Sequence, residues 1–154
     1  MNLRHINEKD QIHLKEIYFD SINSIEENIY NKSQKLAWCS QAWEDNKFNK
    51  ILSDGKGWVI QENKILLGFA IRFPPQKLAL LYVRGNSKRK GYGSILLDLV
   101  EKDVVSEGYK NIETEASLIS YGLLIKRNWE VLRKEKIIIK DINFVRYKMI
   151  KKFT

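Results

Sequence analysis

Apolar and polar positions in the first third of the chain predict one short strand and two helices. Residues 3–6 favour a strand, and residues 9–23 carry apolar side chains at helical spacing. A second helix is expected to start with Ser33 as its N-cap, because a serine side chain accepts a hydrogen bond from the first helical turn. The chain therefore begins with a strand and two N-terminal helices.

The middle of the chain reads as a meander of three strands. The sequence DGKG at residues 54–57 predicts a turn, and the apolar-rich runs 58–62 and 65–73 follow it, joined by the turn dipeptide Asn-Lys. Two consecutive prolines then interrupt the pattern, and residues 77–83 form the fourth strand. Short connections of this kind favour antiparallel pairing.

A long amphipathic helix is predicted over residues 91–107. Its apolar residues recur every three or four positions, which gives the helix one apolar face. Gly108 suits its C-terminal end. Residues 109–117 then read as the fifth strand and residues 120–127 as a short helix.

The last part of the chain predicts a hairpin. Residues 129–140 and 143–152 read as two strands about a turn at Asp141–Ile142. The whole pattern indicates a mixed α/β (α+β) fold with a mostly antiparallel central sheet of six to seven strands. A chain of 154 residues suits one domain, which we expect to span residues 1–154.

Composition narrows the class of protein. Apolar residues make up 44% and charged residues 30% of the chain, as in an ordinary globular domain. The longest apolar run, residues 65–71, is far shorter than the roughly 20 residues that cross a bilayer. The start MNLRHINEKD has no apolar stretch of a secretory signal, and a single cysteine, Cys39, fits a reducing compartment. We expect a cytoplasmic protein with no membrane partner and, given two histidines, no metal site.

The formal net charge of +8 leaves several partners open. A basic chain attracts nucleic acid, anionic lipid or a small polyanion, although dispersed lysines also serve solubility alone. The cluster RKEK at residues 133–136 falls on the predicted hairpin, and no recognised nucleic-acid motif accompanies it. The location of the basic residues along the chain, more than the net charge, must therefore identify the ligand.

The junction between the fourth strand and the long helix combines basic residues with glycines. Lys88, Arg89 and Lys90 directly precede Gly91 and Gly93. The first turn of a helix has free N–H groups and partial positive charge, and both favour a phosphate. Glycines let a phosphate approach the backbone closely. This junction is suited to a phosphate-bearing ligand, although it matches neither a Walker loop nor a dinucleotide fingerprint.

The same junction resembles the acetyl-CoA-binding motif of the GNAT N-acetyltransferase superfamily. The family pattern is Gln/Arg-x-x-Gly-x-Gly/Ala, and KRKGYG lies on it, with Lys88 at the Gln/Arg position. The segment EASLISYGLLIKRNWEVLRKEKIIIKDINFVRYKM is similar to the family's closing segment, which is followed by two strands. The segments YNKSQKLAWCSQ and WVIQENKILLGFA resemble the small bacterial YafP-like subgroup.

The resemblance implies a GNAT fold with a long central helix and a short C-terminal helix, and acetyl-CoA as the acyl donor. The cofactor's pantetheine arm is then expected between the fourth and fifth strands, with its pyrophosphate on the glycine loop. The cofactor-binding positions carried over from the family are Leu81, Tyr82, Val83, Lys88, Arg89, Lys90, Gly91, Tyr92, Gly93 and Ser94.

The resemblance also implies direct attack of a primary amine on the thioester. The family's usual acid for the thiolate is a tyrosine, but Leu124 stands at that position, so Tyr121, about one helical turn earlier, is the candidate acid. Glu115, which shares a strand face with Glu113, is the candidate base or acceptor ligand. A water chain is the alternative to a protein base. Trp38 and Trp43 are either an aromatic wall for the acceptor or core residues packed at helical spacing.

Two further interpretations stay open at this point. The loss of the family tyrosine is consistent with a catalytically weak or inactive CoA-binding protein, and the basic hairpin with a nucleic-acid-binding domain. The acceptor, a small amine or a peptide amine, is not specified by these residues, and we expect a monomer or a homodimer.

Overall fold

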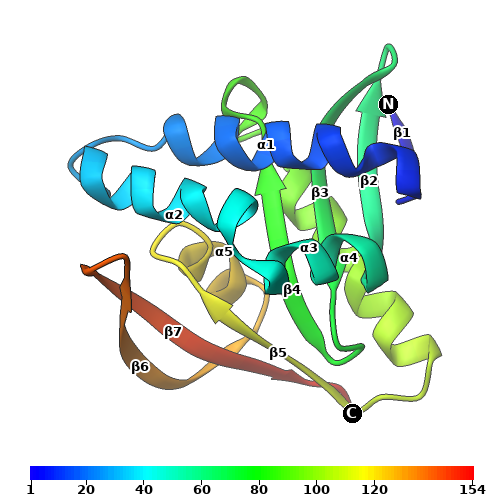
Figure 1. Ribbon diagram of the computed structural model, residues 1–154. Helices are drawn as coiled ribbons and strands as arrows, with labels where there is room; N and C mark the ends of the chain where they lie inside the picture. The colour runs from blue at the N-terminus through cyan, green and yellow to red at the C-terminus, as the bar shows by residue number, and fades with distance from the viewer.

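A single seven-stranded sheet runs through the computed structural model, which describes residues 1–154. The strand order is β1-β2-β3-β4-β5-β7-β6 (Figure 1). All neighbouring strands pair antiparallel except β4 and β5, which are parallel, so the prediction of a mixed, mostly antiparallel sheet is confirmed. The strands are β1 (Asn2–His5), β2 (Lys56–Glu62), β3 (Ile65–Arg72), β4 (Lys77–Val83), β5 (Asn111–Ala116), β6 (Glu130–Ile139) and β7 (Ile142–Lys152).

Five α-helices cover the sheet in two layers (Figure 1). They are α1 (Gln11–Asn23), α2 (Lys32–Glu44), α3 (Asn46–Asp54), α4 (Tyr92–Ser106) and α5 (Tyr121–Lys126). The first three lie on one face of the sheet, and α4 and α5 lie on the other. The long central helix and the short C-terminal helix are therefore present as predicted. No helix combines the length and apolar character needed to span a bilayer.

The start of α2 differs from the sequence prediction by two residues. Its N-cap is Asn31, not Ser33. The Asn31 side chain accepts a hydrogen bond from the N–H of Gln34, and the Gln34 side chain accepts one from the N–H of Asn31, both at 2.9 Å. This reciprocal capping box satisfies two donors at once, which a serine two residues later could not do.

The helix α3 lies where the sequence pattern predicts none. Asp45 caps it by accepting a hydrogen bond from the N–H of Lys47, and Phe48 and Leu52 are buried against the sheet. The two apolar residues stand four positions apart, so the helical spacing was present in the sequence, but over only nine residues.

Left-handed turns set the ends of several elements. Asn63 and Lys64 have φ of 51° and 68° and join β2 to β3 in the predicted turn. Lys140 and Asp141, with φ of 49° and 65°, join β6 to β7, so this turn lies one residue earlier than predicted and Ile142 already belongs to β7. Gly108 follows α4 with φ of 89°, as its predicted role requires.

Three hydrophobic clusters hold these layers together. The two large clusters lie between the sheet and α1–α3 on one side, and between the sheet and α4–α5 on the other. The third, smaller cluster joins α2 to the β6–β7 hairpin through Tyr30, Ala37 and Phe144. Full burial of one large apolar side chain stabilises a fold by roughly 1.5–3 kcal/mol, so this cluster firmly attaches the hairpin to α2.

The sheet opens between its two parallel strands. The β4–β5 ladder has only two residue pairs, Lys77 with Glu113 and Leu78 with Thr114. The Thr114 hydroxyl donates a hydrogen bond of 2.7 Å to the carbonyl of Leu78 at the end of this ladder. From Ala79 onward, β4 has a strand partner only on the β3 side. The strands diverge there, and the edge of β4 that faces β5 is left without a partner strand.

Candidate active site

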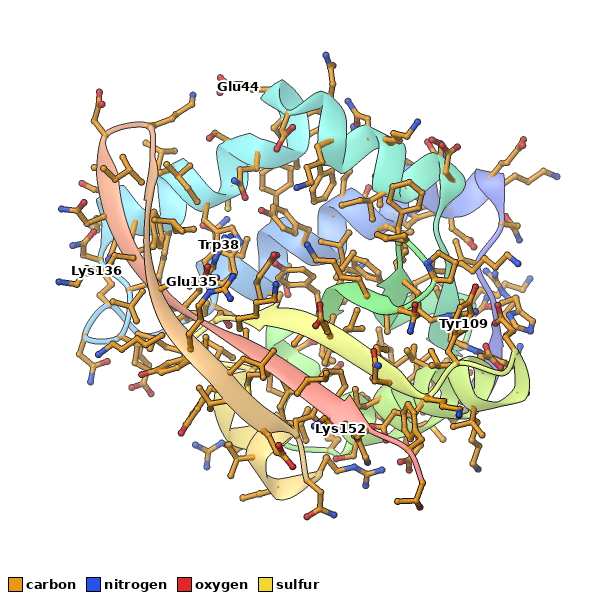
Figure 2. All side chains as sticks on the ribbon, turned by 90° about the horizontal axis from the view of Figure 1, so that it is seen from below. Trp38, Glu44, Tyr109, Glu135, Lys136 and Lys152 are labelled. Atoms are coloured by element: carbon orange, nitrogen blue, oxygen red, sulfur yellow. The ribbon has the colours of Figure 1, made fainter.

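A cavity of about 210 Å³ occupies the opening between β4 and β5. Residues 78–82 of β4 form one wall and Glu115 of β5 lies opposite. Trp38 of α2 and Phe144 and Arg146 of the hairpin close the remaining sides. Figure 2 labels Trp38 on α2, and its side chain packs against the cluster that contains Phe144 of the hairpin. The walls are mostly apolar and aromatic, which is typical of a small-molecule site.

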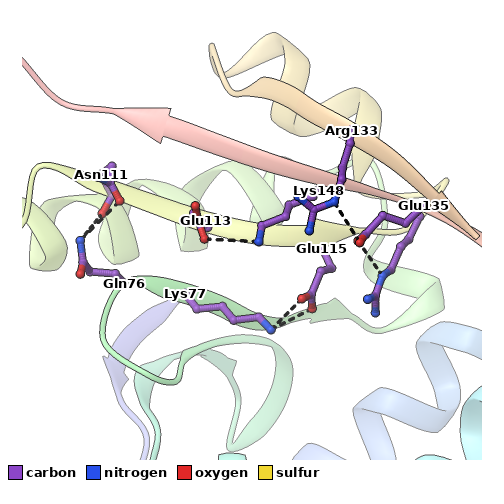
Figure 3. Close-up of polar contacts among 9 residues, drawn as sticks. Gln76, Lys77, Asn111, Glu113, Glu115, Arg133, Glu135 and Lys148 are labelled. Atoms are coloured by element: carbon purple, nitrogen blue, oxygen red, sulfur yellow. Dashed lines mark hydrogen bonds and ion pairs between the residues drawn. The ribbon is translucent and has the colours of Figure 1, made fainter. Parts of the chain in front are cut away.

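The carboxylate in this cavity belongs to Glu115. Lys77 Nζ contacts its two oxygens at 3.0 and 2.8 Å (Figure 3). Burial by itself raises the pKa of Glu115, but the hydrogen bond and charge of Lys77, with the charges of Arg146 and Lys47, outweigh burial and leave the pKa lowered. The side chain therefore stays ionised at neutral pH. An ionised carboxylate of lowered pKa binds an ammonium group well and accepts a proton poorly.

The guanidinium in the cavity belongs to Arg146. Its Nε donates a hydrogen bond of 3.1 Å to Glu135. Arg133 donates one of 3.2 Å to the other oxygen of the same carboxylate (Figure 3). The two Nη groups of Arg146 have no hydrogen-bond partner in the protein. Arg146 is thus held through its Nε and has two free Nη groups, with four N–H donors, next to the cavity.

A buried tyrosine that the sequence pattern did not single out also lines the cavity. Tyr30 lies between α1 and α2 and is 2% exposed. Its hydroxyl accepts a hydrogen bond of 2.9 Å from the N–H of Leu118, which leaves the hydroxyl hydrogen free to be donated. Burial raises the pKa of Tyr30, so the hydroxyl remains protonated at neutral pH. No local sequence signal marks Tyr30, because it meets the cavity only after α2 and the hairpin pack together.

The α5 positions differ in their relation to the cavity. Leu124 is fully buried and lines it, whereas Tyr121 is not among the residues that do. The Tyr121 ring lies 4.5 Å from the ring of Tyr147, measured between centroids. Glu113, which shares a strand face with Glu115, contacts Lys148 at 4.0 Å outside the cavity. The role of Tyr121 as an acid stays a prediction.

Of the two tryptophans of α2, only one lines the cavity. Trp38 lines the cavity and receives a hydrogen bond of 2.7 Å on its carbonyl from the hydroxyl of Tyr18. Trp43 is exposed and stacks on Phe19 away from the cavity. Cys39 is a buried free thiol whose pKa is raised by burial, as in a packing residue.

The glycine loop has the geometry of an open anion site. Gly91 is the N-cap of α4, with φ of 81°, and no side chain caps the helix. The N–H groups of the first turn, at Tyr92, Gly93 and Ser94, therefore point to an uncapped end. A Cβ built on Gly91 meets no atom within 4 Å, whereas one on Gly93 lies 3.1 Å from Leu123 Cδ2. Gly91 keeps the approach open, and Gly93 allows α4 to pack closely on α5.

The three basic residues of the loop divide into two groups. Lys88 Nζ donates hydrogen bonds to the carbonyl of Ser21 at 3.0 Å and to the hydroxyl of Ser24 at 2.7 Å, and burial lowers its pKa. It thus connects the loop to the C-terminal end of α1. Arg89 and Lys90 are exposed and make no ion pair, so they are the free cations beside the uncapped helix.

Of the predicted strand positions, Leu81 and Tyr82 line the cavity and Val83 lies just beyond it. All three belong to the part of β4 without a partner on the β5 side. The structure therefore brings together Leu81, Tyr82 and Glu115 around the cavity, and groups Arg89 to Ser94 at the start of α4.

The family follows from a comparison with known proteins. The model of the acetyltransferase (GNAT) family matches residues 16–123, well over half of the chain. The chain belongs to the GNAT acetyltransferase family. The matched range includes the second half of α1, the diverging β4 and the glycine loop. The finer assignment to the YafP-like subgroup stays a prediction.

Solved structures share the fold of this GNAT protein. The GCN5-related N-acetyltransferase "Aminotransferase, Class-II" from Rhodopseudomonas palustris is 24% identical, with a TM-score of 0.91 over 99% of this chain and 95% of that one. The PaiA N-acetyltransferase from Thermoplasma acidophilum, solved in complex with coenzyme A, is 18% identical, with a TM-score of 0.75 over 99% and 100%. No curated protein matches the chain.

Proposed function

We propose that the protein is an N-acetyltransferase that transfers the acetyl group of acetyl-CoA to a primary amine by direct attack. The observation that carries this proposal is the unpartnered edge of β4, which runs from a cavity to an uncapped helix N-terminus. Membership of the family and the coenzyme A held by the Thermoplasma acidophilum protein support acetyl-CoA as the donor. We propose that residues 1–154 act as one domain, since one sheet connects β1 to β7.

The donor would extend along the opening between β4 and β5. Backbone groups at Leu81, Tyr82 and Val83 would bind the pantetheine arm in place of a neighbouring strand. The N–H groups at the start of α4 would bind the pyrophosphate, with Arg89 and Lys90 adding positive charge. A cavity of about 210 Å³ is smaller than a drug-sized ligand site, so it suits the thioester end and the acceptor, not the whole cofactor.

The chemistry needs a neutral amine, a polarised thioester carbonyl and a proton for the departing thiolate. A new C–N bond forms as the C–S bond breaks, the amine releases a proton and the coenzyme A sulfur takes one up. N–H groups of the open β4 edge would polarise the carbonyl. Tyr30, with a free hydroxyl hydrogen in the cavity, and Tyr121 are the two candidates for the acid. Holding amine and thioester together in the apolar cavity adds a proximity effect.

A binding and turnover experiment tests the proposal. Titration calorimetry should show saturable acetyl-CoA binding at one site, and a panel of amines should yield free thiol from acetyl-CoA only when an acceptor is present. Saturable binding without acetylation of any amine would instead establish the alternative that the buried Leu124 favours, a CoA-binding protein without transferase activity. Failure to bind acetyl-CoA at all would refute both.

A further inference from the structure

We propose that the acceptor is a free amino acid with an apolar side chain, a class of amine that carries a carboxylate next to its amino group. This inference rests on the proposed function and specifies its substrate class. It comes from the pair of opposite charges that the fold places in one apolar cavity.

Glu115 and Arg146 are the only two charged side chains among the residues that line the cavity. The other walls are mostly aliphatic and aromatic, including Ile25, Trp38 and Phe144. Each charge is already paired on one side, Glu115 with Lys77 and Arg146 with Glu135, so the site is stable without a ligand. A ligand that carries both signs adds a partner to each charge on the cavity side. A polyamine offers only cations, and it would leave Arg146 facing a like charge.

The two charged groups lie close enough for one small molecule to contact both. Glu115 is directly opposite Lys148 in the β5–β7 ladder, and Arg146 is two positions farther along β7, on the same face of the sheet. They are therefore diagonal neighbours, with Cα atoms roughly 7–8 Å apart. The charge of Arg146 also contributes to the lowered pKa of Glu115, as this proximity requires. A ligand whose ammonium and carboxylate groups are on neighbouring atoms suits the distance between Glu115 and Arg146 better than a ligand with charges at the two ends of a long chain.

The free end of Arg146 has the geometry of a carboxylate receptor. Glu135 binds its Nε at 3.1 Å and fixes the plane of the guanidinium, while both Nη groups remain without a partner. A guanidinium with free donors binds a carboxylate through parallel hydrogen bonds. Glu115, ionised and held by Lys77, would bind the ammonium group of the same molecule. The apolar walls would then receive the side chain.

The N-terminus of a protein lacks the feature that Arg146 recognises. Its α-carboxyl group is converted to a neutral amide, so it cannot form a charged pair with a guanidinium. The ammonium form of a free amino acid first releases a proton to solvent water. The neutral amine then attacks the thioester, the C–N bond forms, the C–S bond breaks, and coenzyme A leaves as the thiol with an N-acetyl amino acid.

Matched acceptors test the inference. Leucine, leucinamide and isopentylamine share one side chain, but only leucine has the carboxylate. We expect kcat/KM for leucine to exceed that for the other two by about 100-fold, because only leucine offers a carboxylate to the free Nη groups of Arg146. Arg146→Gln should remove this preference by lowering the value for leucine alone, and Arg146→Lys should restore part of it. Lys134→Gln is the control, since Lys134 is exposed on β6, makes no ion pair and does not line the cavity, and it should leave the preference for leucine unchanged.

Equal use of leucine and leucinamide by the wild type, with no effect of Arg146→Gln, would overturn the inference. Preference for leucinamide or for a peptide N-terminus would overturn it in favour of a peptide acceptor. If acetyl-CoA binds but no amine is acetylated, titration of leucine into the protein saturated with coenzyme A decides the question. Binding that Arg146→Gln abolishes would uphold the amino-acid site although the transferase proposal had failed, and absence of binding would refute the site.

Discussion

Gly91→Glu offers a sharp test of the anion site at the start of α4, because the chain contains a matched control. Gly91 and Gly108 both have left-handed backbone, with φ of 81° and 89°, and a Cβ on either meets no atom within 4 Å. Gly91 precedes α4 and Gly108 follows it. Glutamate at either position therefore introduces the same side chain, charge and backbone strain, but only Gly91→Glu introduces them where the phosphate is expected.

The structure sets the size of both effects. A residue with a Cβ in left-handed backbone costs roughly 1–2 kcal/mol, so each variant should unfold about 2–8 °C below the wild type. A carboxylate about 4 Å from one phosphate charge costs about 1 kcal/mol at the dielectric constant of water and about 4 kcal/mol at an effective value of 20. Gly91→Glu should therefore weaken acetyl-CoA binding between about fivefold and about a thousandfold.

Thermal unfolding and calorimetric titration of the two variants provide the measurements. Gly108→Glu should lose stability but bind acetyl-CoA with wild-type affinity. Gly91→Glu should lose a comparable amount of stability and most of its affinity, and added salt should reduce that loss. If folded Gly91→Glu bound acetyl-CoA as tightly as Gly108→Glu does, the start of α4 would not be the phosphate site.

The loop cations and the two tyrosines yield further predictions. Replacing both Arg89 and Lys90 by alanine should weaken acetyl-CoA binding and make the affinity less dependent on salt concentration. Lys88→Ala should instead lower the melting temperature and leave that salt dependence unchanged, because Lys88 hydrogen-bonds to the C-terminal end of α1. An unchanged slope in the double variant would show that those two charges are only solvated. Tyr30→Phe should lower kcat by about 100-fold and leave the affinity for acetyl-CoA unchanged. Tyr121→Phe should lower kcat by less than about threefold, because only Tyr30 lines the cavity. The reverse order of kcat values, measured by thiol release at saturating substrate, would place the acid on α5.

The parts of the fold that depend on local sequence were predictable. The helix α4, its C-terminal Gly108 and the strands β2 to β4 follow from spacing and turn residues within a few positions of one another. The same locality explains the errors. Asn31 and Ser33 are both possible N-caps for α2 and lie only two residues apart, so the sequence pattern did not distinguish them. The helix α3 has only nine residues, which is too short for its apolar spacing to be recognised.

The composition of the cavity could not be predicted in the same way. Glu115 and the strand positions follow from a single motif each, but Arg146 and Tyr30 reach the cavity through contacts between distant parts of the chain. The hairpin must pair with β5 and pack on α2 before these two side chains line the same cavity as Glu115. No periodicity within one element contains that information, so only the assembled structure identifies them.

The two-residue ladder between β4 and β5 has a consequence for how the protein responds to its ligand. Five residues of β4, from Ala79 to Val83, have a pairing edge that the protein itself leaves vacant. A ligand that hydrogen-bonds to this edge takes the place of a neighbouring strand. Because it binds only the folded protein, its binding raises the free energy of unfolding. In the free protein, this seam is where we expect amide protons to exchange with solvent before those of the flanking ladders. If acetyl-CoA binds to this edge as proposed, the protein would gain the missing pairing when the donor binds and lose it again when the product leaves.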